Sequence, residues 1–517
     1  MSNTSMSKMK WVAVSCIWLM ICGVCVMGYR WVFVPRMEEE AKAEESAYKK
    51  SLLKRTSSKA RYENQVTINL DSFSGYSVIR SPEFMDELGS RGIGLNLIDD
   101  NANYTQRLID IRDGNAQFAA FTIDALIKAS KELNEFPGVI IFVIDESVGA
   151  DAAIGVERTL ANIDALNSPE TKFVLVPDSP SETLARVIIA NFGLDKLSED
   201  PFIPVNSAQE LYDNYRNHKP TDKNIFVTWE PNVTKMATNP DYKVFVDSSK
   251  FRGYILDVMV VSRDFLVKNP KIVYSVTTSY FRSLYKLRNN MDKLLVDDAL
   301  SMGDPIKPEL AEVLNKKIRW KNTRENYGHF GVVKGTGLRH MDDMIRNIVD
   351  VLVQTKDIDS DPLRGRYNQL YYSEVLQAML DANFHPGNLG SEEDVRGEKE
   401  LEALSDADWN KLDVVGTLKV DHLVFPRGTA ILTPTSKNVL DKLVKKLQDA
   451  PQFYLLVTGN ASTKGDLEAN TKLAMSRANA AKDYLIEKGI ASQRIKAVGG
   501  EPSGETVVNF VVGQMPY

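Results

Sequence analysis

The chain has 517 residues, of which 43% are hydrophobic, 9% aromatic and 26% charged. This composition excludes wholesale disorder, and the length suggests roughly two to four domains. Lys and Arg together number 63 and Asp and Glu number 69, so the formal net charge is −6. A general nucleic-acid binder needs a basic surface, and no nucleic-acid partner is therefore expected.

The chain has few cysteines and histidines that could bind a metal or act as a nucleophile. All three cysteines, Cys16, Cys22 and Cys25, lie in one apolar stretch near the N-terminus. The rest of the chain therefore has no disulfide, no thiolate zinc site and no cysteine nucleophile. The histidines do not show metal-ligand spacing, and no catalytic triad order, P-loop or dinucleotide fingerprint is present. We expect neither a cofactor nor a metal, and no enzymatic activity; the five histidines are His218, His329, His340, His385 and His422.

A membrane anchor is predicted near the N-terminus. Residues 11–29 carry no charge, and 19 residues in a helix span about 28 Å, close to the thickness of a bilayer core. Lys8 and Lys10 precede this run and Glu38–Glu40 follow it, so the positive-inside rule places residues 1–10 in the cytoplasm. A cleaved signal peptide is the alternative, but no small-x-small site follows the run. We expect an uncleaved single-pass anchor over residues 11–34 in a bacterial inner membrane, with the bulk of the chain in the periplasm or cell envelope.

After the anchor, the composition divides the chain into four further parts. Residues 38–62 carry 12 charges in 25 positions without Gly or Pro, which predicts a charged stalk over 35–64. Residues 65–384 form a block that is too long for one ordinary core, so two lobes are expected. An acidic linker, 385–413, and a small C-terminal domain, 414–517, follow.

The large block alternates strand-like and amphipathic runs, which predicts an α/β domain. Helices are expected over Thr183–Phe192 and Lys271–Leu287. The predicted strands are Val66–Leu70, Val139–Ile144, Phe173–Val176, Ile225–Thr228, Val244–Val246 and Val258–Val261.

Four segments of this block carry a resemblance to a known family: residues 113–127, 139–154, 226–236 and 253–273. Together they resemble periplasmic substrate-binding proteins of the nitrate, sulfonate and taurine type. The resemblance covers about 300 residues and implies a two-lobed type II fold that closes on a small polar or anionic solute. It also implies an ABC permease as the transport partner.

In this family the cleft-facing ends of strands and the crossovers between the lobes contact the ligand. Ser179-Pro180-Ser181-Glu182 has the pattern of a helix cap, and its free amides would favour an anion, although plain capping is the alternative. The ten ligand-binding candidates are Ser74, Gly75, Tyr76, Thr122, Ser147, Asp151, Ser181, Trp229, Glu230 and Asp257.

Two of these groups have structural alternatives. Asp145, Glu146 and Asp151 place three carboxylates in seven residues at a predicted lobe crossing. They either bind a cation or amine or hold the hinge through capping. Trp229 ends a predicted strand, where a tryptophan either packs in the core or forms an aromatic wall of the cleft.

The C-terminal domain is predicted to alternate strands and helices. The expected strands are Leu418–Phe425, Phe453–Thr458, Arg494–Val498 and Thr506–Val512, and the expected helices are Pro434–Gln448 and Leu467–Lys488. In the first helix, Val439, Leu440 and Leu443 begin one apolar stripe, which predicts a face buried against the strands.

Gly459, Gly465, Asn470, Arg477 and Gly489 mark a spacing that carries a second resemblance. They fall in the register of the OmpA-like peptidoglycan-associated family, which this domain resembles over roughly 100 residues. In the family, an Asp and an Arg grip the diaminopimelate end of the wall peptide. Arg477 occupies the Arg position, whereas Ser462 stands at the Asp position and cannot pair with an ammonium as a carboxylate does.

The resemblance therefore implies peptidoglycan binding by Ser462, Asn470 and Arg477, weakened by the loss of the acidic residue. A structural role for Arg477 within its own helix is the alternative. Taken together, the sequence predicts a membrane-anchored solute-binding protein that an OmpA-like domain holds near the cell wall. The alternative is an envelope scaffold or sensor with a degenerate cleft and no role in transport.

Overall fold

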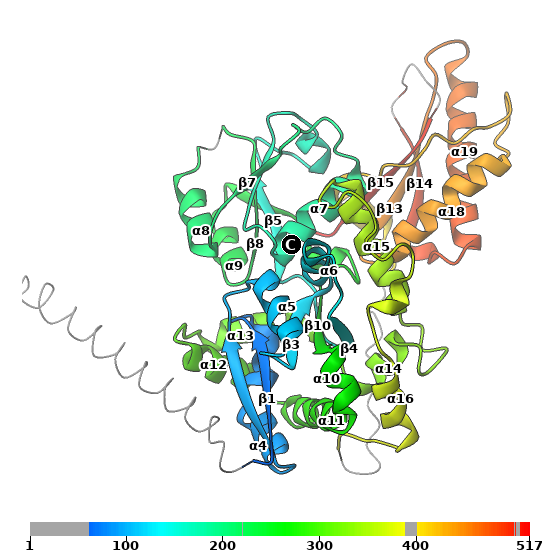
Figure 1. The fold of residues 1–517 in the computed structure, drawn as a ribbon. Helices are drawn as coiled ribbons and strands as arrows, with labels where there is room; N and C mark the ends of the chain where they lie inside the picture. Colours follow the sequence, from blue (N-terminus) through cyan, green and yellow to red (C-terminus); the bar gives the residue numbers. More distant parts are fainter. Residues whose placement is uncertain (1–61, 220, 388–400, 501, 503–506, 517) are drawn as a thin grey trace, which may run out of the picture.

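The computed structural model describes residues 62–219, 221–387, 401–500, 502 and 507–516 (Figure 1). The predicted anchor over 11–34 and all but the end of the stalk over 35–64 lie outside these residues, as does the acidic part of the linker. Within the described residues, no helix combines the length and apolarity that crossing a membrane requires.

The first lobe is built on a six-stranded sheet in the order β11-β4-β10-β3-β1-β2. Strands β1, β2 and β3 are parallel, whereas β10 runs antiparallel to both β3 and β4, and β11 runs antiparallel to β4. The residues of the central strands β3, β4 and β10 are mostly apolar and all buried, as expected for strands covered on both faces, whereas β2 at the edge is partly exposed. The bounds are β1 Asn64–Leu70, β2 Ile93–Asp99, β3 Phe118–Thr122, β4 Gly138–Ser147, β10 Leu256–Ser262 and β11 Ile318–Trp320.

The second lobe is built on a five-stranded sheet in the order β7-β6-β8-β5-β9. Strand β6 is parallel to β7 and β8, and β5 is antiparallel to β8 and β9. The bounds are β5 Asp151–Val156, β6 Lys172–Leu175, β7 Phe202–Pro204, β8 Asn224–Trp229 and β9 Tyr242–Asp247.

Two crossovers join the lobes. The chain passes from β4 into β5 through residues 148–150 and returns from β9 to β10 through residues 248–255. The predicted division of this block into two lobes is therefore confirmed. We call the region where the two lobes meet the lobe junction: the ends of β3 and β4, the start of β10, the start of β5 and the first turn of α7 (Pro180–Phe192).

Helices cover both sheets (Figure 1). In the first lobe α11 packs on α4, and α15 contacts both α6 of the first lobe and α7 of the second. Besides α7, the helices of the large domain are α3 Ser77–Arg80, α4 Pro82–Gly89, α5 Tyr104–Asp113, α6 Ile123–Leu133, α8 Ala208–Asn217, α9 Asn232–Ala237, α10 Arg263–Lys268, α11 Pro270–Leu287, α12 Met291–Met302, α13 Pro308–Lys317, α14 Thr323–His329, α15 Met341–Gln354 and α16 Glu374–Asp381.

All six predicted strands and both predicted helices of the large domain are present, with ends shifted by at most three residues. The list of predicted strands omitted five others, β2, β3, β5, β7 and β11. Strand β2 contains a glycine and an asparagine, which strands disfavour, and β7 and β11 have only three residues each. Their pairing with neighbouring strands, rather than their own composition, makes them strands.

The C-terminal domain has a four-stranded sheet in the order β12-β15-β13-β14. In Figure 1, α18 and α19 lie together beside this sheet, and α19 contacts β13 and β14. The bounds are α17 Asp406–Trp409, β12 Asp413–Thr417, α18 Pro434–Asp449, β13 Tyr454–Asn460, α19 Leu467–Glu487, β14 Ile495–Gly499 and β15 Val507–Gln514.

One strand of this domain was predicted wrongly. Residues 418–425 are not a strand, and the edge of β15 is paired instead with β12, just before them. The backbone N–H and carbonyl of Val424 bond to the Ser436 hydroxyl of α18, at 2.8 and 2.7 Å. Because a side chain already satisfies these backbone groups, the alternating pattern of Leu418–Phe425 does not need a sheet partner.

The described end of the linker belongs to the C-terminal domain. The Trp409 ring packs edge-on against Tyr454 of β13, with 5.5 Å between ring centroids, and the Tyr454 hydroxyl donates to the Glu402 carbonyl at 2.9 Å. The domain thus gathers residues from before its predicted start at 414.

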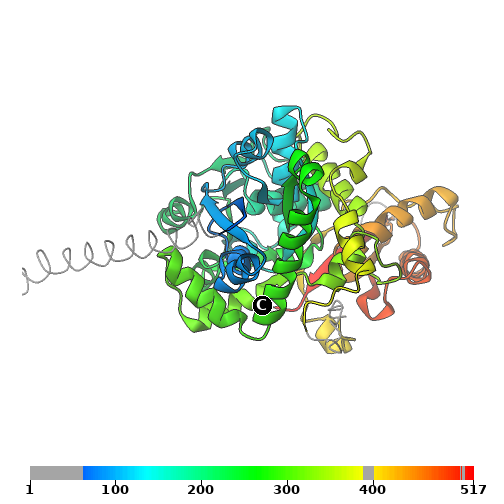
Figure 2. The ribbon, with the colours of Figure 1, turned by 60° about the horizontal axis from the view of Figure 1, so that its bottom comes forward.

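The C-terminal domain also packs on the large domain. Thr417 donates its N–H and hydroxyl to Asp164 of the second lobe, at 2.9 and 3.0 Å. Arg339, just before α15, pairs with Asp449 at 2.8 Å. Figure 2, turned by 60°, keeps the orange and red C-terminal domain at one side of the blue-to-green large domain.

Candidate functional site

A row of polar side chains crosses the first-lobe sheet at the lobe junction. Asp257 of β10 lies opposite Thr122 of β3 on one side and opposite Asp145 of β4 on the other. Residues directly opposite one another in antiparallel strands share a face of the sheet. Thr122, Asp257 and Asp145 therefore form one row, and each is at most 2% exposed.

Within this row, Asp145 and Asp257 form a carboxyl pair without a basic partner. The Tyr76 hydroxyl donates to Asp257 Oδ1 at 2.5 Å, whereas neither oxygen of Asp145 accepts a hydrogen bond from a hydroxyl or N–H group. Burial raises the pKa of both carboxyls, and the neighbouring Asp145 charge raises the pKa of Asp257 further. Two buried carboxylates that lie side by side without a basic partner do not both stay ionised, so the pair holds a proton.

The loop that precedes α3 covers this pair. The Gly75 carbonyl accepts a hydrogen bond from Trp320 Nε1 at 2.8 Å, which fixes the loop over the sheet. A Cβ atom at Gly75 would lie 2.3 Å from Asp145 Oδ2, so only glycine allows this approach. Ser74 is half-buried at the edge of the same loop.

Asp151 approaches from the second lobe. Its two oxygens accept hydrogen bonds from the hydroxyls of Ser181, at 2.7 Å, and Ser147, at 2.8 Å. Burial raises the pKa of Asp151 to about 6. The structure thus brings the predicted residues Tyr76, Thr122 and Asp257 of the first lobe to the same junction as Ser147, Asp151 and Ser181.

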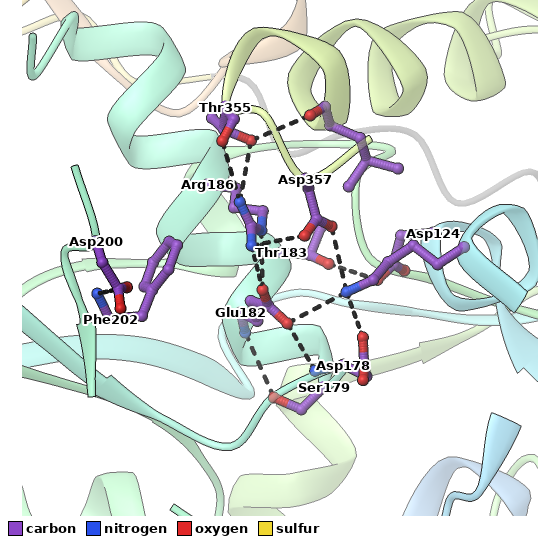
Figure 3. Close-up of polar contacts among 12 residues, drawn as sticks. Asp124, Asp178, Ser179, Glu182, Thr183, Arg186, Asp200, Phe202, Thr355 and Asp357 are labelled. Carbon is purple, nitrogen blue, oxygen red and sulfur yellow. Dashed lines mark hydrogen bonds and ion pairs between the residues drawn. The ribbon is translucent and has the colours of Figure 1, made fainter. Parts of the chain in front are cut away.

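The first turn of α7 is held by the chain's own charged groups (Figure 3). Ser179 caps the helix by accepting the Glu182 N–H, as the sequence predicted. Glu182 Oε2 accepts the Asp178 N–H at 2.6 Å rather than closing a capping box with Ser179, and Glu182 also pairs with Arg186. The Thr183 hydroxyl donates to Asp124 Oδ2 of α6 at 2.5 Å, which links the two lobes.

A cation from the first lobe completes this cluster. Lys128 of α6 forms ion pairs with Asp178, at 2.5 Å, with Asp357, at 3.2 Å, and with Glu182, at 3.3 Å. Arg186 reaches Asp357 at 2.7 Å. The α7 N-terminus, which the sequence suggested for a solute anion, therefore lies among carboxylates that belong to the protein.

Glu146 and Glu230 are engaged elsewhere. Glu146 accepts the Gly253 N–H at 2.8 Å and pairs with the buried Lys321 at 2.5 Å, so it ties one crossover to the other. Glu230 accepts the N–H and hydroxyl of Thr234 in α9 and pairs with Lys317 at 2.5 Å. Of the alternatives for the 145–151 carboxylates, Glu146 thus takes the hinge role. Trp229 is half-buried at the end of β8, opposite Asp151.

Sequence reasoning missed several groups at the junction. Asp124 begins α6 two residues after Thr122, and its acidic first-turn position was the signal that could have found it. Lys321 lies more than 170 residues along the chain from its partner Glu146, and Asp357 lies more than 170 residues from its partner Arg186. No local sequence pattern marks either residue.

Two of the cavities on the described surface have volumes of about 310 and 340 Å³. The first is lined by residues of the second lobe around His218 and Phe226, and the second by Tyr274, Arg282 and residues 382–387. Neither cavity contains a predicted ligand-binding residue.

In the C-terminal domain, Arg477 lies on α19 as predicted. Its Nε donates to the Thr429 carbonyl at 2.9 Å, and its guanidinium lies 4.8 Å from the centre of the Phe425 ring. Asn470, two turns earlier, donates to the carbonyls of Ser462 and Lys464, at 3.1 and 2.8 Å. Asn470 thus shapes the loop that carries Ser462, and Arg477 binds the 425–429 segment.

Three solved structures are similar to the large domain and cover 62–65% of this chain at 9–12% identity. They are a periplasmic sulfonate-binding protein from Methylobacillus flagellatus KT (TM-score 0.46, 95% of that chain), a periplasmic nitrate-binding protein from Synechocystis PCC 6803 (0.46, 88%) and a periplasmic aliphatic sulphonate-binding protein from Escherichia coli (0.44, 98%). We infer the two-lobed fold from the strand order of the two sheets and from the two crossovers that join them.

The C-terminal domain has relatives in sequence. A peptidoglycan-associated lipoprotein from Mesorhizobium japonicum is 31% identical over 78 residues, which are 15% of this chain and 46% of that protein. An outer membrane protein A from Serratia odorifera is 36% identical over 85 residues, which are 16% of this chain and 35% of that protein. The chain thus spans less than half the length of these relatives. Residues 424–505 match the OmpA family. The chain therefore carries an OmpA domain in its C-terminal part, after the two-lobed α/β domain.

Proposed function

We propose that this protein is a membrane-anchored, extracytoplasmic solute-binding protein that captures a small polar or anionic solute between its two lobes. Residues 11–34 anchor it in the bacterial inner membrane with residues 1–10 inside, and the OmpA domain holds it near the cell wall. An ABC permease would receive the solute, and no catalysis is involved.

One observation carries this proposal. Six predicted ligand-binding residues, scattered over about 180 positions of the sequence, meet at the lobe junction although they come from four strands, a loop and a helix. Most buried polar groups in proteins are paired, yet neither oxygen of Asp145 accepts a hydrogen bond from a hydroxyl or N–H group of the described residues. Polar groups gathered at the hinge between two lobes are the arrangement that solute capture requires.

Closure of the lobes on a solute should be measurable in solution. Because the two crossovers are short and continuous with the sheets, we expect the lobes to rotate as units about residues 148–150 and 248–255. A solute found by thermal-shift screening should reduce the radius of gyration in small-angle X-ray scattering. A scattering profile that stays unchanged when a bound solute saturates the protein would contradict the proposal.

For the OmpA domain, we propose binding to the peptide of the cell wall at Arg477, with Asn470 shaping the adjoining Ser462 loop. Nε is the only atom of the Arg477 guanidinium that forms a hydrogen bond with the described residues. The two terminal nitrogens can therefore form a fork for the carboxylate of a wall peptide.

Two substitutions should change wall binding in opposite directions. Arg477→Ala removes a charge-assisted pair of about 1.5–3 kcal/mol and should weaken binding at least about tenfold. Ser462→Asp restores an acidic partner for the ammonium group and should strengthen binding. Pull-down of the full-length protein with purified peptidoglycan measures both, and Lys472→Ala, an exposed substitution on the same helix, is the matched control. If neither the wild type nor Ser462→Asp binds, the domain does not attach to the wall.

A second candidate function is an envelope scaffold or sensor without transport. The observation that favours it is the pairing within the junction, where Ser181 bonds to Asp151 and Thr183 bonds to Asp124. In such a protein the lobes stay closed on their own contacts. The scattering experiment separates the two, since a scaffold shows the compact profile in every solution condition.

A further inference from the structure

We propose that the cavity between α11 and the segment after α16 binds a small organic oxyanion, whose phosphate or carboxylate group is held by Arg282 and His385 with Arg91 beside it. This site is separate from the lobe junction and does not depend on the capture of a solute between the lobes. In Figure 1, α11 and α16 lie at the foot of the first lobe, whereas α7 and the second lobe lie above it.

The cavity has the size of a small-molecule site. Its volume is about 340 Å³, and sites for small molecules commonly have about 300–1,000 Å³. Helix α11 contributes Tyr274 and Arg282, and the segment that follows α16 contributes residues 382–387, which include Phe384 and His385. Aromatic rings and a few N–H donors thus line the same space.

Arg282 brings an unpaired positive charge to this cavity. No hydrogen bond or ion pair joins its guanidinium to a described residue, and its Nε is buried. The guanidinium lies 5.5 Å from the centre of the Phe384 ring, a cation–π contact that orients it. The side chain as a whole is half-buried, so an anion in the cavity can reach it. Because an arginine has five N–H donors, Arg282 favours an acceptor that the described residues do not supply.

The His385 ring supplies a second donor. Its Nδ1 accepts the Gly387 N–H at 3.0 Å, so the neutral ring carries its proton on Nε2. Nε2 is buried and has no hydrogen-bond partner among the described residues. The ring packs edge-on against Tyr285 of α11, with 5.8 Å between ring centroids, which fixes it next to the helix that carries Arg282. His385 Nε2 is therefore a donor without an acceptor.

A second arginine lies beside the cavity. Arg91, just after α4, donates from Nη1 to the Thr278 hydroxyl at 2.7 Å. Tyr274, Thr278 and Arg282 follow one another at intervals of four residues, so they share one face of α11. Burial lowers the pKa of Arg91, and the positive charge of Arg282 lowers it further. The two arginines are thus close enough to repel each other, and a bound anion offsets this repulsion.

The acidic groups near the cavity do not pair with the arginines. Glu87 of α4, whose charge raises the pKa of Arg91, forms an ion pair with Lys286 at 2.5 Å. Asp381, at the end of α16, is exposed and accepts from Gln377 at 2.9 Å. No carboxyl group lines the described cavity itself. The charge in excess here is positive, which favours an anion and opposes a cation.

The donors and the rings together indicate the class of anion. Phosphate and carboxylate oxygens accept several N–H bonds at once, and arginine binds both groups through paired donors. The rings of Tyr274 and Phe384 offer an apolar surface on which the rest of an organic anion can pack. An aromatic phosphate and an aromatic carboxylate are therefore suitable probes.

The test uses the full-length protein in a mild detergent and titrates phenyl phosphate, benzoate and choline at equal ionic strength, which removes general screening effects. We expect phenyl phosphate or benzoate to raise the melting temperature and to give a saturable calorimetric isotherm, and choline to do neither. The two anions show which group the site takes. If neither anion binds, or if choline binds as tightly as they do, the proposal is wrong.

Substitutions locate the bound anion. Arg282→Met should raise its Kd at least about tenfold, because it removes charge-assisted hydrogen bonds but keeps an unbranched side chain. Arg282→Lys should retain part of the affinity, since the charge remains. Arg112→Met is the matched control, because it removes the same charge from the exposed face of α5 and should leave the Kd unchanged.

Unfolding curves show whether each variant is folded. Anion binding that Arg282→Met leaves unchanged would overturn the site, and if the lobes also become compact in scattering, the anion is the solute of the lobe junction. Loss of anion binding in Arg282→Met without any change in the scattering profile supports the cavity. Failure of the cavity leaves the proposed solute capture intact, because the two sites share no residue.

Discussion

Replacing Arg107 by leucine should lower the free energy of unfolding of the large domain by about 3–5 kcal/mol, because it leaves buried carboxylates without their cation. Arg107 is fully buried, and its Nε donates to Asp100 Oδ2 at 2.7 Å while Nη2 donates to Asp71 Oδ2 at 3.0 Å. A further N–H is bound by the Ala120 carbonyl of β3. Burial alone would lower the pKa of Arg107, but the bonds to Asp100 and the charge of Asp71 raise it, so the side chain stays charged.

Urea unfolding followed by tryptophan fluorescence measures this loss. Arg112→Leu, five residues later on the same helix, is the control, because Arg112 is exposed and its partner Asp113 can return to water. Its unfolding midpoint should match that of the wild type. An Arg107→Leu midpoint equal to that of Arg112→Leu would show that the buried cluster does not stabilise the fold.

Replacing Lys321 by methionine should lower the free energy of unfolding by a similar amount, about 3–5 kcal/mol at pH 7.5. Lys321 is 2% exposed and is the hydrogen-bonded cation of Glu146, whereas Arg252 is 4.0 Å away from that carboxylate. Without Lys321, the described residues leave Glu146 the Gly253 N–H and the more distant Arg252, at the crossover between the lobes.

The free energy of unfolding that Lys321→Met loses should become smaller as the pH falls. The direction of this change follows from proton binding. In the wild type, burial alone would raise the pKa of Glu146, but the Lys321 charge holds it well below its usual range. The folded state then binds fewer protons than the unfolded state, so this pair stabilises the protein above the unfolded pKa and less as the pH falls. In Lys321→Met, burial keeps the proton on Glu146, and the variant loses stability as the pH rises.

Unfolding curves at pH 7.5 and pH 5 measure the difference, with Lys293→Met as the control because Lys293 forms an exposed pair with Asp297. If the difference in free energy of unfolding between the wild type and Lys321→Met is the same at both pH values, Glu146 does not depend on Lys321 for its charge.

The predicted site residues show where sequence reasoning was sufficient. Thr122, Ser181 and Asp257 each stand next to a strand or helix end that periodicity and capping residues mark, and such ends meet at one edge of an α/β sheet. The sequence could therefore place them near the crossovers. It could not show that Asp257 lies opposite Asp145, because that contact depends on the register of β10 against β4 over more than 100 intervening residues.

The C-terminal arginines show the same limit within a single domain. Arg477 and Arg494 both fall in the register of the OmpA-like family. Arg494 is buried and donates to the carbonyls of Phe453 and Ala450, whereas the Arg477 guanidinium stays half-buried beside the 425–429 segment. Only the packing of α19 and β14 against the sheet buries one arginine among backbone carbonyls and leaves the other half-buried at the 425–429 segment.

The sequence by itself determined the features that depend on neighbouring residues. These are the apolar segment at 11–29, the helices, with the cap of α7 at Ser179 and the start of α18 at Pro434, the hydrophobic strands and the match of the tail to the OmpA family. The tertiary structure decided which charges meet: Lys321 with Glu146, Asp257 with Asp145, and Thr183 with Asp124. The reason is physical. Local structure follows from backbone propensity and periodicity, whereas burial and charge pairing between distant segments exist only once the chain has folded.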